Sequence, residues 1–238
     1  MRLNWNVIKF GVIAVLIAVL FSFSGRRNDA RNLTELDVRF VDETPPFITL
    51  STVNKLLIQN EDSVTSIGKD KVVLNEMERR LLENPMVRDA QVFVTVEGKL
   101  GARIEQRDPI ARIAGSPHYY LDDEGKKMPL SEVHTARVPL VTGTSKTQFA
   151  ELTPLLLRIR NDDFMRQMVV GLHRRADGEV ELRLRKHDLK VLFGTPETID
   201  LKFQNFKAFY QKTKEDNTLE GYTRVNLKFG NQVVATKK

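Results

Sequence analysis

The fold is decided by residues 84–112, which read NPMVRDAQVFVTVEGKLGARIEQRDPIAR. Every second residue of the segment 90–96 is apolar: Ala90, Val92, Val94 and Val96. The segment that returns after the turn residues Glu97-Gly98-Lys99 alternates in the same way: Leu100, Ala102 and Ile104. Alternation with a period of two is typical of strands with one buried face, so this stretch predicts a β-hairpin.

Upstream of the hairpin, the sequence predicts one strand and two helices. Apolar side chains alternate in residues 33–41, which indicates a strand with one buried side. Ser51 is expected to cap a short helix. Asn75 is expected to cap a second helix, with Glu78 at the capping-box position three residues later. Strand, helix, helix and hairpin together predict a small α/β module over residues 33–113.

Downstream, residues 114–238 predict a mainly antiparallel β-domain with flanking helices. Glu124-Gly125 and Asp177-Gly178 are turn signals between alternating segments, and each predicts a hairpin. Thr153 is expected to cap a helix that begins at Pro154. Another helix is indicated by an apolar stripe at helical spacing: Ile199, Phe203, Phe206 and Tyr210. A packed core explains this stripe better than a ligand groove does.

Near the amino terminus, residues 7–24 are almost entirely apolar, and Lys9 is their only charged residue. A helix needs roughly 17–20 apolar residues to cross a hydrocarbon core of about 30 Å. We therefore expect a transmembrane helix at 7–24, preceded by a short cytoplasmic tail at 1–6. The alternative is a cleavable signal peptide, for which Ser22-Phe23-Ser24 would be a poor cleavage site.

The orientation of this helix follows from the size of what comes after it. Basic residues lie at both ends of the apolar stretch: Arg2 before it and Lys9 near its start, and Arg26, Arg27 and Arg31 after it. Their count therefore does not settle the topology. Long polar domains cross membranes largely regardless of charge. We expect the amino terminus in the cytoplasm and the carboxyl-terminal bulk in the periplasm.

The composition and motifs predict no catalytic centre, no cofactor and no metal site. The chain has 37 basic and 31 acidic residues, no long basic block and no zinc-finger spacing, so nucleic-acid binding is not expected. No cysteine is present, which excludes disulfides and thiolate catalysis. The four histidines lack metal-ligand spacing, Asp122-Asp123-Glu124 fits a turn, and Asp162-Asp163 fits a loop. We therefore expect a protein that is not an enzyme.

Two parts of the sequence resemble the FtsQ/DivIB family of bacterial cell-division proteins. Residues 84–92 and 102–112 resemble the end of the family's POTRA domain. They depart from its pattern at Met86, where the family often has Trp, and at Glu97-Gly98, which replace a Trp-Pro turn. Residues 119–130 and 138–143 resemble the family's entry into its β-domain.

The last predicted strand carries the partner site that this resemblance implies. In the family, the terminal strand lies near an edge of the β-domain and pairs with an extended segment of the FtsB/FtsL (DivIC-like) coiled-coil proteins. The residues assigned to it are Arg224, Val225, Asn226, Leu227, Lys228, Phe229, Gly230 and Asn231. Periodicity alone favours an ordinary edge strand, protected by Arg224 and Lys228 and with Phe229 in the core.

The resemblance implies a single-pass protein of the bacterial inner membrane that acts at the division septum. It would be a divisome scaffold that recruits the FtsB/FtsL pair and other divisome proteins. One alternative is a POTRA protein of outer-membrane assembly or secretion, which would require repeated modules or a β-barrel. Another is a membrane-anchored periplasmic enzyme, which would require titratable residues that converge in a pocket.

Overall fold

The computed structural model describes residues 5–29, 33–42, 45–58, 65, 73–145, 149–230 and 232–238. The chain divides into two compact units, Met1–Gln106 and Arg107–Lys238. The sequence predicts a later boundary, between residues 113 and 114. The structure moves it because the strand Pro109–Ile113 pairs with strands of the second unit.

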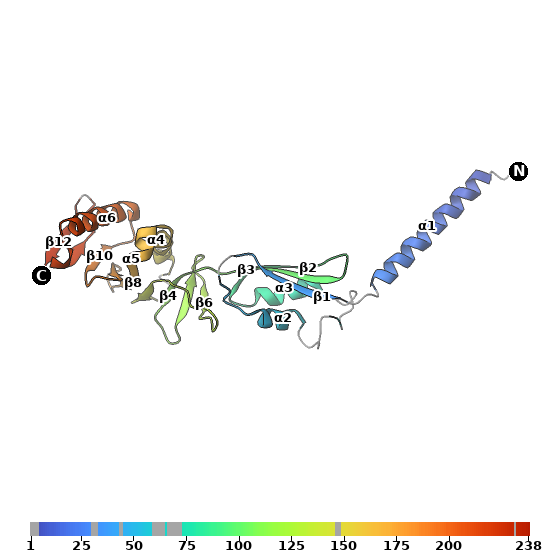
Figure 1. The fold of residues 1–238 in the computed structure, drawn as a ribbon, viewed down its shortest axis with the longest axis horizontal. Helices are drawn as coiled ribbons and strands as arrows, with labels where there is room; N and C mark the ends of the chain where they lie inside the picture. Colours follow the sequence, from blue (N-terminus) through green and yellow to red (C-terminus); the bar gives the residue numbers. More distant parts are fainter. Residues whose placement is uncertain are drawn as a thin grey trace. The chain divides into compact units, whose positions relative to one another are not determined.

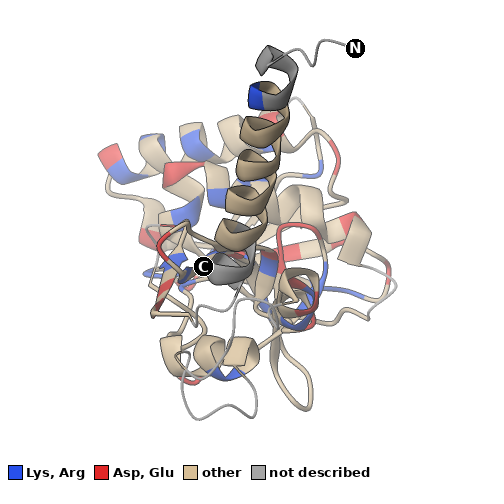
Figure 2. Cartoon of the chain, turned by 90° about the vertical axis from the view of Figure 1, so that its right-hand side faces the viewer, with Lys and Arg blue, Asp and Glu red and all other residues tan. Residues whose placement is uncertain are grey.

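Helix α1 spans Trp5–Asp29, and after Lys9 its described residues are predominantly apolar on all sides up to Ser24. Its side chains are described from Lys9 to Ser24, and Lys9 is the only charged residue among them (Figure 2). The large apolar side chains of this stretch are exposed, from Ile13 at 52% to Phe21 at 82%. In the part of the chain that the structure describes, no helix meets the length and apolarity needed for a membrane span.

After α1, the described part of the first unit forms a three-stranded sheet and two α-helices, in the chain order that the sequence predicts. The elements are β1 (Glu35–Phe40), α2 (Leu50–Ile58), α3 (Leu74–Leu82), β2 (Val87–Val94) and β3 (Lys99–Gln106). The sheet order is β1-β3-β2, with β3 parallel to β1 and antiparallel to β2. The predicted hairpin is confirmed: Leu100, Ala102 and Ile104 are all buried.

Both predicted helix caps of this unit are wrong. Helix α2 begins before Ser51, and the Thr49 hydroxyl accepts a hydrogen bond from the Thr52 amide at 3.0 Å. Helix α3 begins before Asn75, and its N-cap residue, Val73, makes no side-chain cap bond. The Glu78 carboxylate instead accepts a hydrogen bond from the Val92 amide at 2.8 Å, so it links the helix to β2.

The register of the hairpin explains one glycine in β3. Gly101 lies opposite Phe93, and a Cβ at this position would come within 2.4 Å of the phenylalanine ring. Only glycine lets this ring lie over the neighbouring strand. Val96 was predicted to share the buried face of the hairpin, but it lies beyond the end of β2 and is 85% exposed.

The second unit has a nine-stranded mixed sheet in the order β12-β11-β10-β9-β8-β7-β4-β5-β6. Its strands are β4 (Pro109–Ile113), β5 (Tyr119–Asp122), β6 (Lys127–Pro129), β7 (Leu140–Thr142), β8 (Val169–Arg174), β9 (Val180–Leu184), β10 (Lys190–Gly194), β11 (Tyr222–Asn226) and β12 (Val234–Lys237). Among these described strands, three pairs are parallel (β4–β7, β7–β8 and β10–β11) and the others are antiparallel. The predicted hairpin turns are confirmed, with positive φ at Gly125 (75°) and Gly178 (89°).

Helices α4 (Phe149–Asn161), α5 (Asp163–Met168) and α6 (Ile199–Glu215) pack on this sheet, and a 3₁₀ helix (Leu219–Gly221) leads into β11 (Figure 1). The predicted stripe of α6 is confirmed as core, since Phe203 and Phe206 are 2% and 0% exposed. The predicted start of α4 is wrong. The Thr153 hydroxyl donates to the Phe149 carbonyl at 2.8 Å, and Pro154 lies inside the helix.

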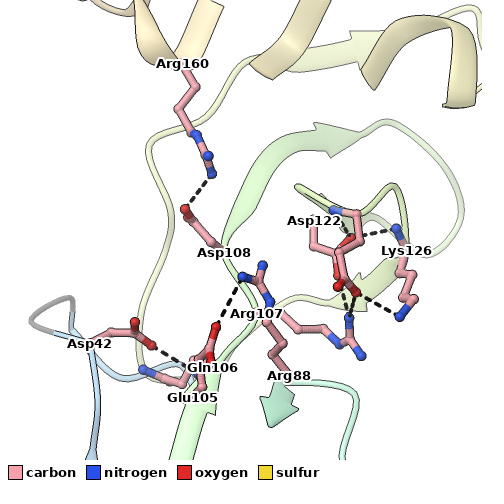
Figure 3. A network of polar contacts seen from close by, with 10 residues as sticks. Asp42, Arg88, Glu105, Gln106, Arg107, Asp108, Asp122, Lys126 and Arg160 are labelled. Carbon is pink, nitrogen blue, oxygen red and sulfur yellow. Dashed lines mark hydrogen bonds and ion pairs between the residues drawn. The ribbon is translucent and has the colours of Figure 1, made fainter. Parts of the chain in front are cut away.

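A buried carboxylate holds the β5–β6 hairpin together (Figure 3). The Asp122 side chain is fully buried and accepts hydrogen bonds from the amides of Glu124 (3.1 Å) and Lys126 (2.6 Å). The Arg107 guanidinium donates to the second carboxylate oxygen of Asp122 at 2.8 Å and to the Glu124 carboxylate at 3.1 Å. The predicted turn is therefore confirmed, and one carboxylate satisfies two turn amides and a largely buried cation.

A second carboxylate, Asp162, joins α5 to α6. Residues 162–163 were predicted to be a loop, but Asp162 is the N-cap of α5 and accepts the Met165 amide at 3.0 Å. It also pairs with Lys207 of α6. Burial acts to raise the pKa of Asp162, but the hydrogen bonds from Lys207 and from the Met165 and Phe164 amides outweigh it and lower the pKa.

We expect Asp162→Ala to lower the free energy of unfolding by about 0.5–2 kcal/mol at neutral pH, as loss of an N-cap does. The lowered pKa makes this contribution pH-dependent. It is fully present above the unfolded-state pKa of about 3.9, and it is lost as the pH falls through the lower folded-state pKa. Urea unfolding followed by circular dichroism at several pH values measures the difference between the two proteins. A difference that stayed constant into strong acid would contradict the assigned role of the carboxylate.

Candidate protein-interaction site

The predicted partner strand does not lie at an edge of the sheet. Residues Arg224, Val225 and Asn226 belong to β11, which pairs with β10 on one side and with β12 on the other. The Leu227 amide, just after the strand, donates to the Leu192 carbonyl at 2.8 Å. The backbone groups of this segment are therefore engaged on both sides, so a partner strand cannot add to it directly.

The side chains of this segment divide between the core and the surface. Val225 and Leu227 are 0% and 1% exposed and pack in the core, so they are not available to a partner. Arg224 and Lys228 are on the surface, and the Lys228 ammonium pairs with Glu179 at 2.5 Å. Phe229 is 48% exposed, so the alternative that placed it in the core is wrong.

The chain turns away from the sheet after β11. The Asn226 side chain accepts a hydrogen bond from the Lys228 amide at 3.0 Å, which closes an Asx turn. The Gly230 carbonyl accepts one from the Asn205 side-chain amide of α6 at 3.1 Å. Asn231, the last residue of the predicted site, lies outside the described residues. Phe229 is thus presented on the connection between β11 and β12.

The edge of the sheet at this end is β12, which the sequence pattern did not distinguish from β11. No described strand pairs with the far side of β12. The signal for it was Gly230-Asn231, a turn dipeptide followed by the short run Val233-Val234-Ala235-Thr236. Because β12 folds back on β11 in a hairpin, β12 is the edge strand and β11, which was predicted to be the edge, lies inside the sheet.

The hydrogen bonds of β12 identify the backbone groups that face the open edge. The Lys238 amide donates to the Gly221 carbonyl at 2.8 Å, and the Thr236 carbonyl accepts from the Thr223 hydroxyl at 3.3 Å. Backbone direction alternates along an antiparallel strand, so Val234, Thr236 and Lys238 turn their amides and carbonyls toward β11. Ala235 and Lys237 turn theirs outward.

This edge can accept an added strand. Unpaired amides and carbonyls are a template for an extended chain from another protein, a mode called β-augmentation. The Ala235 side chain packs against the core, whereas Val234 is 43% exposed. An incoming strand would therefore gain main-chain hydrogen bonds at Ala235 and Lys237 and an apolar contact at Val234.

The histidines of the second unit make structural contacts. His173 and Thr142 are joined by a side-chain hydrogen bond of 2.9 Å between neighbouring strands. His187 lies between the Glu220 carboxylate at 2.9 Å and the Tyr210 hydroxyl at 3.0 Å. Across the residues with described positions, no group of three or more His, Asp or Glu side chains is arranged to hold a metal ion.

Known proteins resemble both units. A family model described as "FtsQ/DivIB, C-terminal related" matches residues 108–236, and one described as a POTRA-like domain matches residues 34–105. A cell division protein FtsQ of Salinibacter ruber is 26% identical over 65% of this chain and 66% of its own length. A cell division protein DivIB of Clostridium tetani is 23% identical over 79% of this chain and 74% of its own length.

Proposed function

Because the chain belongs to the FtsQ/DivIB family of cell-division proteins, we propose that it is a divisome scaffold that catalyses no reaction itself. The observation that carries this proposal is the family match over residues 108–236, which reaches Thr236 in the edge strand β12. In this role the protein recruits other division proteins by offering them a strand to pair with.

The proposed place of action is the inner membrane at the division septum. We propose that residues 7–24 anchor the chain as a single transmembrane helix. The exposed apolar side chains of α1, which have no described core to pack against, support this proposal. The amino terminus would then lie in the cytoplasm, and the two units would lie in the periplasm.

The proposed partner is the FtsB/FtsL pair of coiled-coil proteins, bound through an extended segment. That segment adds to β12 at the outward backbone groups of Ala235 and Lys237. The exposed side chains of Arg224 and Phe229, from the segment first assigned to the site, lie on and next to the adjoining strand β11. These two side chains are proposed to contact the partner next to its added strand. Val225 and Leu227 are buried in the core and make no contact with the partner.

A fluorescent fusion of the full chain is expected to form a band at midcell in dividing cells, because a scaffold of septum assembly concentrates where the septum forms. Fluorescence microscopy through the division cycle measures the band. A fusion without residues 7–24 is the control. It is expected to be released from the membrane and to form no band at midcell. Uniform envelope fluorescence of the full chain would contradict the proposed function.

A further inference from the structure

A second surface of the β-domain forms a basic groove of about 700 Å³, distant in sequence from β12. Its walls come from the segment before β7, from α5, from the residues after β9 and from α6. Five cationic side chains line it: Arg137, Arg166, Arg185, Lys186 and Lys214. A groove of this volume lies within the range of sites that bury a small ligand or a few side chains, roughly 300–1,000 Å³.

The positive charge of the basic groove is largely uncompensated. No carboxylate lines it, and the nearest ion pair joins Arg166 to the highly exposed Asp163 at 2.6 Å. With the residues whose positions are described, Arg137, Lys186 and Lys214 form no ion pair. The groove beside β9 and β10 differs, since Glu181 and Asp188 accompany the basic residues that line it.

One cation of the basic groove is held in a fixed direction. The Arg185 Nε donates a hydrogen bond to the Gln167 carbonyl at 3.0 Å. The two terminal nitrogens of this guanidinium form no hydrogen bond with any described residue. A guanidinium offers them in a planar fork that matches both oxygens of a carboxylate.

Three other lining residues of the groove form an apolar wall: Phe164, Met168 and Tyr210. The rings of Phe164 and Tyr210 meet edge to face with centroids 5.2 Å apart, and Met168 is half-buried beside them. The Tyr210 hydroxyl is tied to His187 at 3.0 Å, which fixes the orientation of its ring. The groove therefore combines several cations with a place for an apolar side chain.

From this combination we propose that the basic groove binds an acidic peptide segment that carries an apolar or aromatic side chain. Glu and Asp of the segment pair with the cations, and its apolar side chain packs on Phe164 and Tyr210. A phosphate-bearing polymer would satisfy the charges but would leave the apolar wall exposed to water. The proposal goes beyond the proposed function, because no residue of the groove belongs to β11 or β12.

The test measures binding of a fluorescein-labelled peptide made of Glu and Asp around one central Phe. Fluorescence anisotropy is recorded with the full chain in uncharged detergent micelles. We expect binding that weakens with added salt, and binding at least about tenfold weaker for Lys186→Glu/Lys214→Glu. The matched control is Lys55→Glu/Lys190→Glu, which changes the net charge equally at exposed positions outside the groove and is expected to bind as the unmodified chain does.

Three further probes separate the possible ligands. A peptide with Lys and Arg in place of the acidic residues is expected not to bind, and one with Gly in place of Phe is expected to bind several-fold more weakly. Phosphatidylglycerol mixed into the detergent micelles is expected not to displace the peptide. Equal weakening in the two double variants, equal binding of the Gly peptide, or displacement by phosphatidylglycerol would each overturn the proposal.

Discussion

Ala235→Pro is expected to abolish capture of the FtsB/FtsL pair, lowering the amount retained by about tenfold or more. Proline has no backbone amide, so this variant removes one of the outward-facing donors of β12, and its ring obstructs the approach of a pairing strand. The β11–β12 ladder should persist, because residue 235 turns its amide away from β11. Co-purification of the pair with the full chain in detergent measures the loss.

Two variants control for the effect on the strand itself. Ala235→Val keeps the outward amide and is expected to retain most of the capture. Thr236→Pro removes an amide that faces β11 and is expected to weaken the hairpin as well as the capture, which circular dichroism during thermal unfolding would reveal. Full capture by a folded Ala235→Pro variant would rule out backbone pairing at β12.

Phe229→Ala separates the two proposed contributions to partner binding, the backbone pairing at β12 and the side-chain contact at Phe229. The ring is half-exposed on the connection to β12, so its removal is expected to leave the fold intact and to weaken capture only in part. If Phe229→Ala abolished capture while Ala235→Pro did not, the partner would recognise the side chains of the connection and not the backbone of the edge strand.

Asp122→Ala is expected to have the largest effect on stability, with a loss of about 3–5 kcal/mol in the free energy of unfolding. The substitution leaves the largely buried Arg107 guanidinium without its buried counter-ion and removes the acceptor for the Glu124 and Lys126 amides. Urea unfolding of the full chain followed by far-ultraviolet circular dichroism measures the loss, with separate transitions fitted for the two units.

Asp122→Asn tests which part of this contribution is ionic. Its amide oxygen still accepts the two turn amides but carries no charge, so we expect a smaller loss than for alanine. Glu124→Gln removes an exposed partner of the same arginine and is expected to change stability by less than about 1 kcal/mol. A loss for Asp122→Ala as small as that for Glu124→Gln would contradict the role assigned to the buried pair.

Alternation of apolar residues and turn dipeptides ending in glycine were the reliable patterns in the sequence. The alternating segment after Asp177-Gly178 was predicted to form one strand of a hairpin, and its apolar side chains Val180, Leu182 and Leu184 are all buried. Asp177-Gly178 predicted a turn whose glycine has a φ of 89°. These predictions hold because the apolar period and the turn residues act within a few residues of one another.

Details that depend on competing partners were predicted less well. Ser51, Asn75 and Thr153 are each suitable capping residues, yet all three lie inside helices that begin earlier. Asp162 was assigned to a loop, although it caps α5 and pairs with Lys207, a residue distant in sequence. A cap depends on where packing starts the helix, so a favourable residue type alone does not locate it.

By itself, the sequence determined the family of the protein and most of the elements of its fold. The apolar run near the amino terminus, the hairpin at 84–112 and the terminal strand pointed to one family, to which the chain belongs. Only the tertiary structure decided which strand lies at the edge of the sheet. Strand order depends on pairing between distant segments: β10 pairs with β11 across the whole of α6, and β12 then covers the side of β11 that seemed open. The same pairing across distance gathers the cations of α5, α6 and the β9 end into one groove, which no local pattern contains.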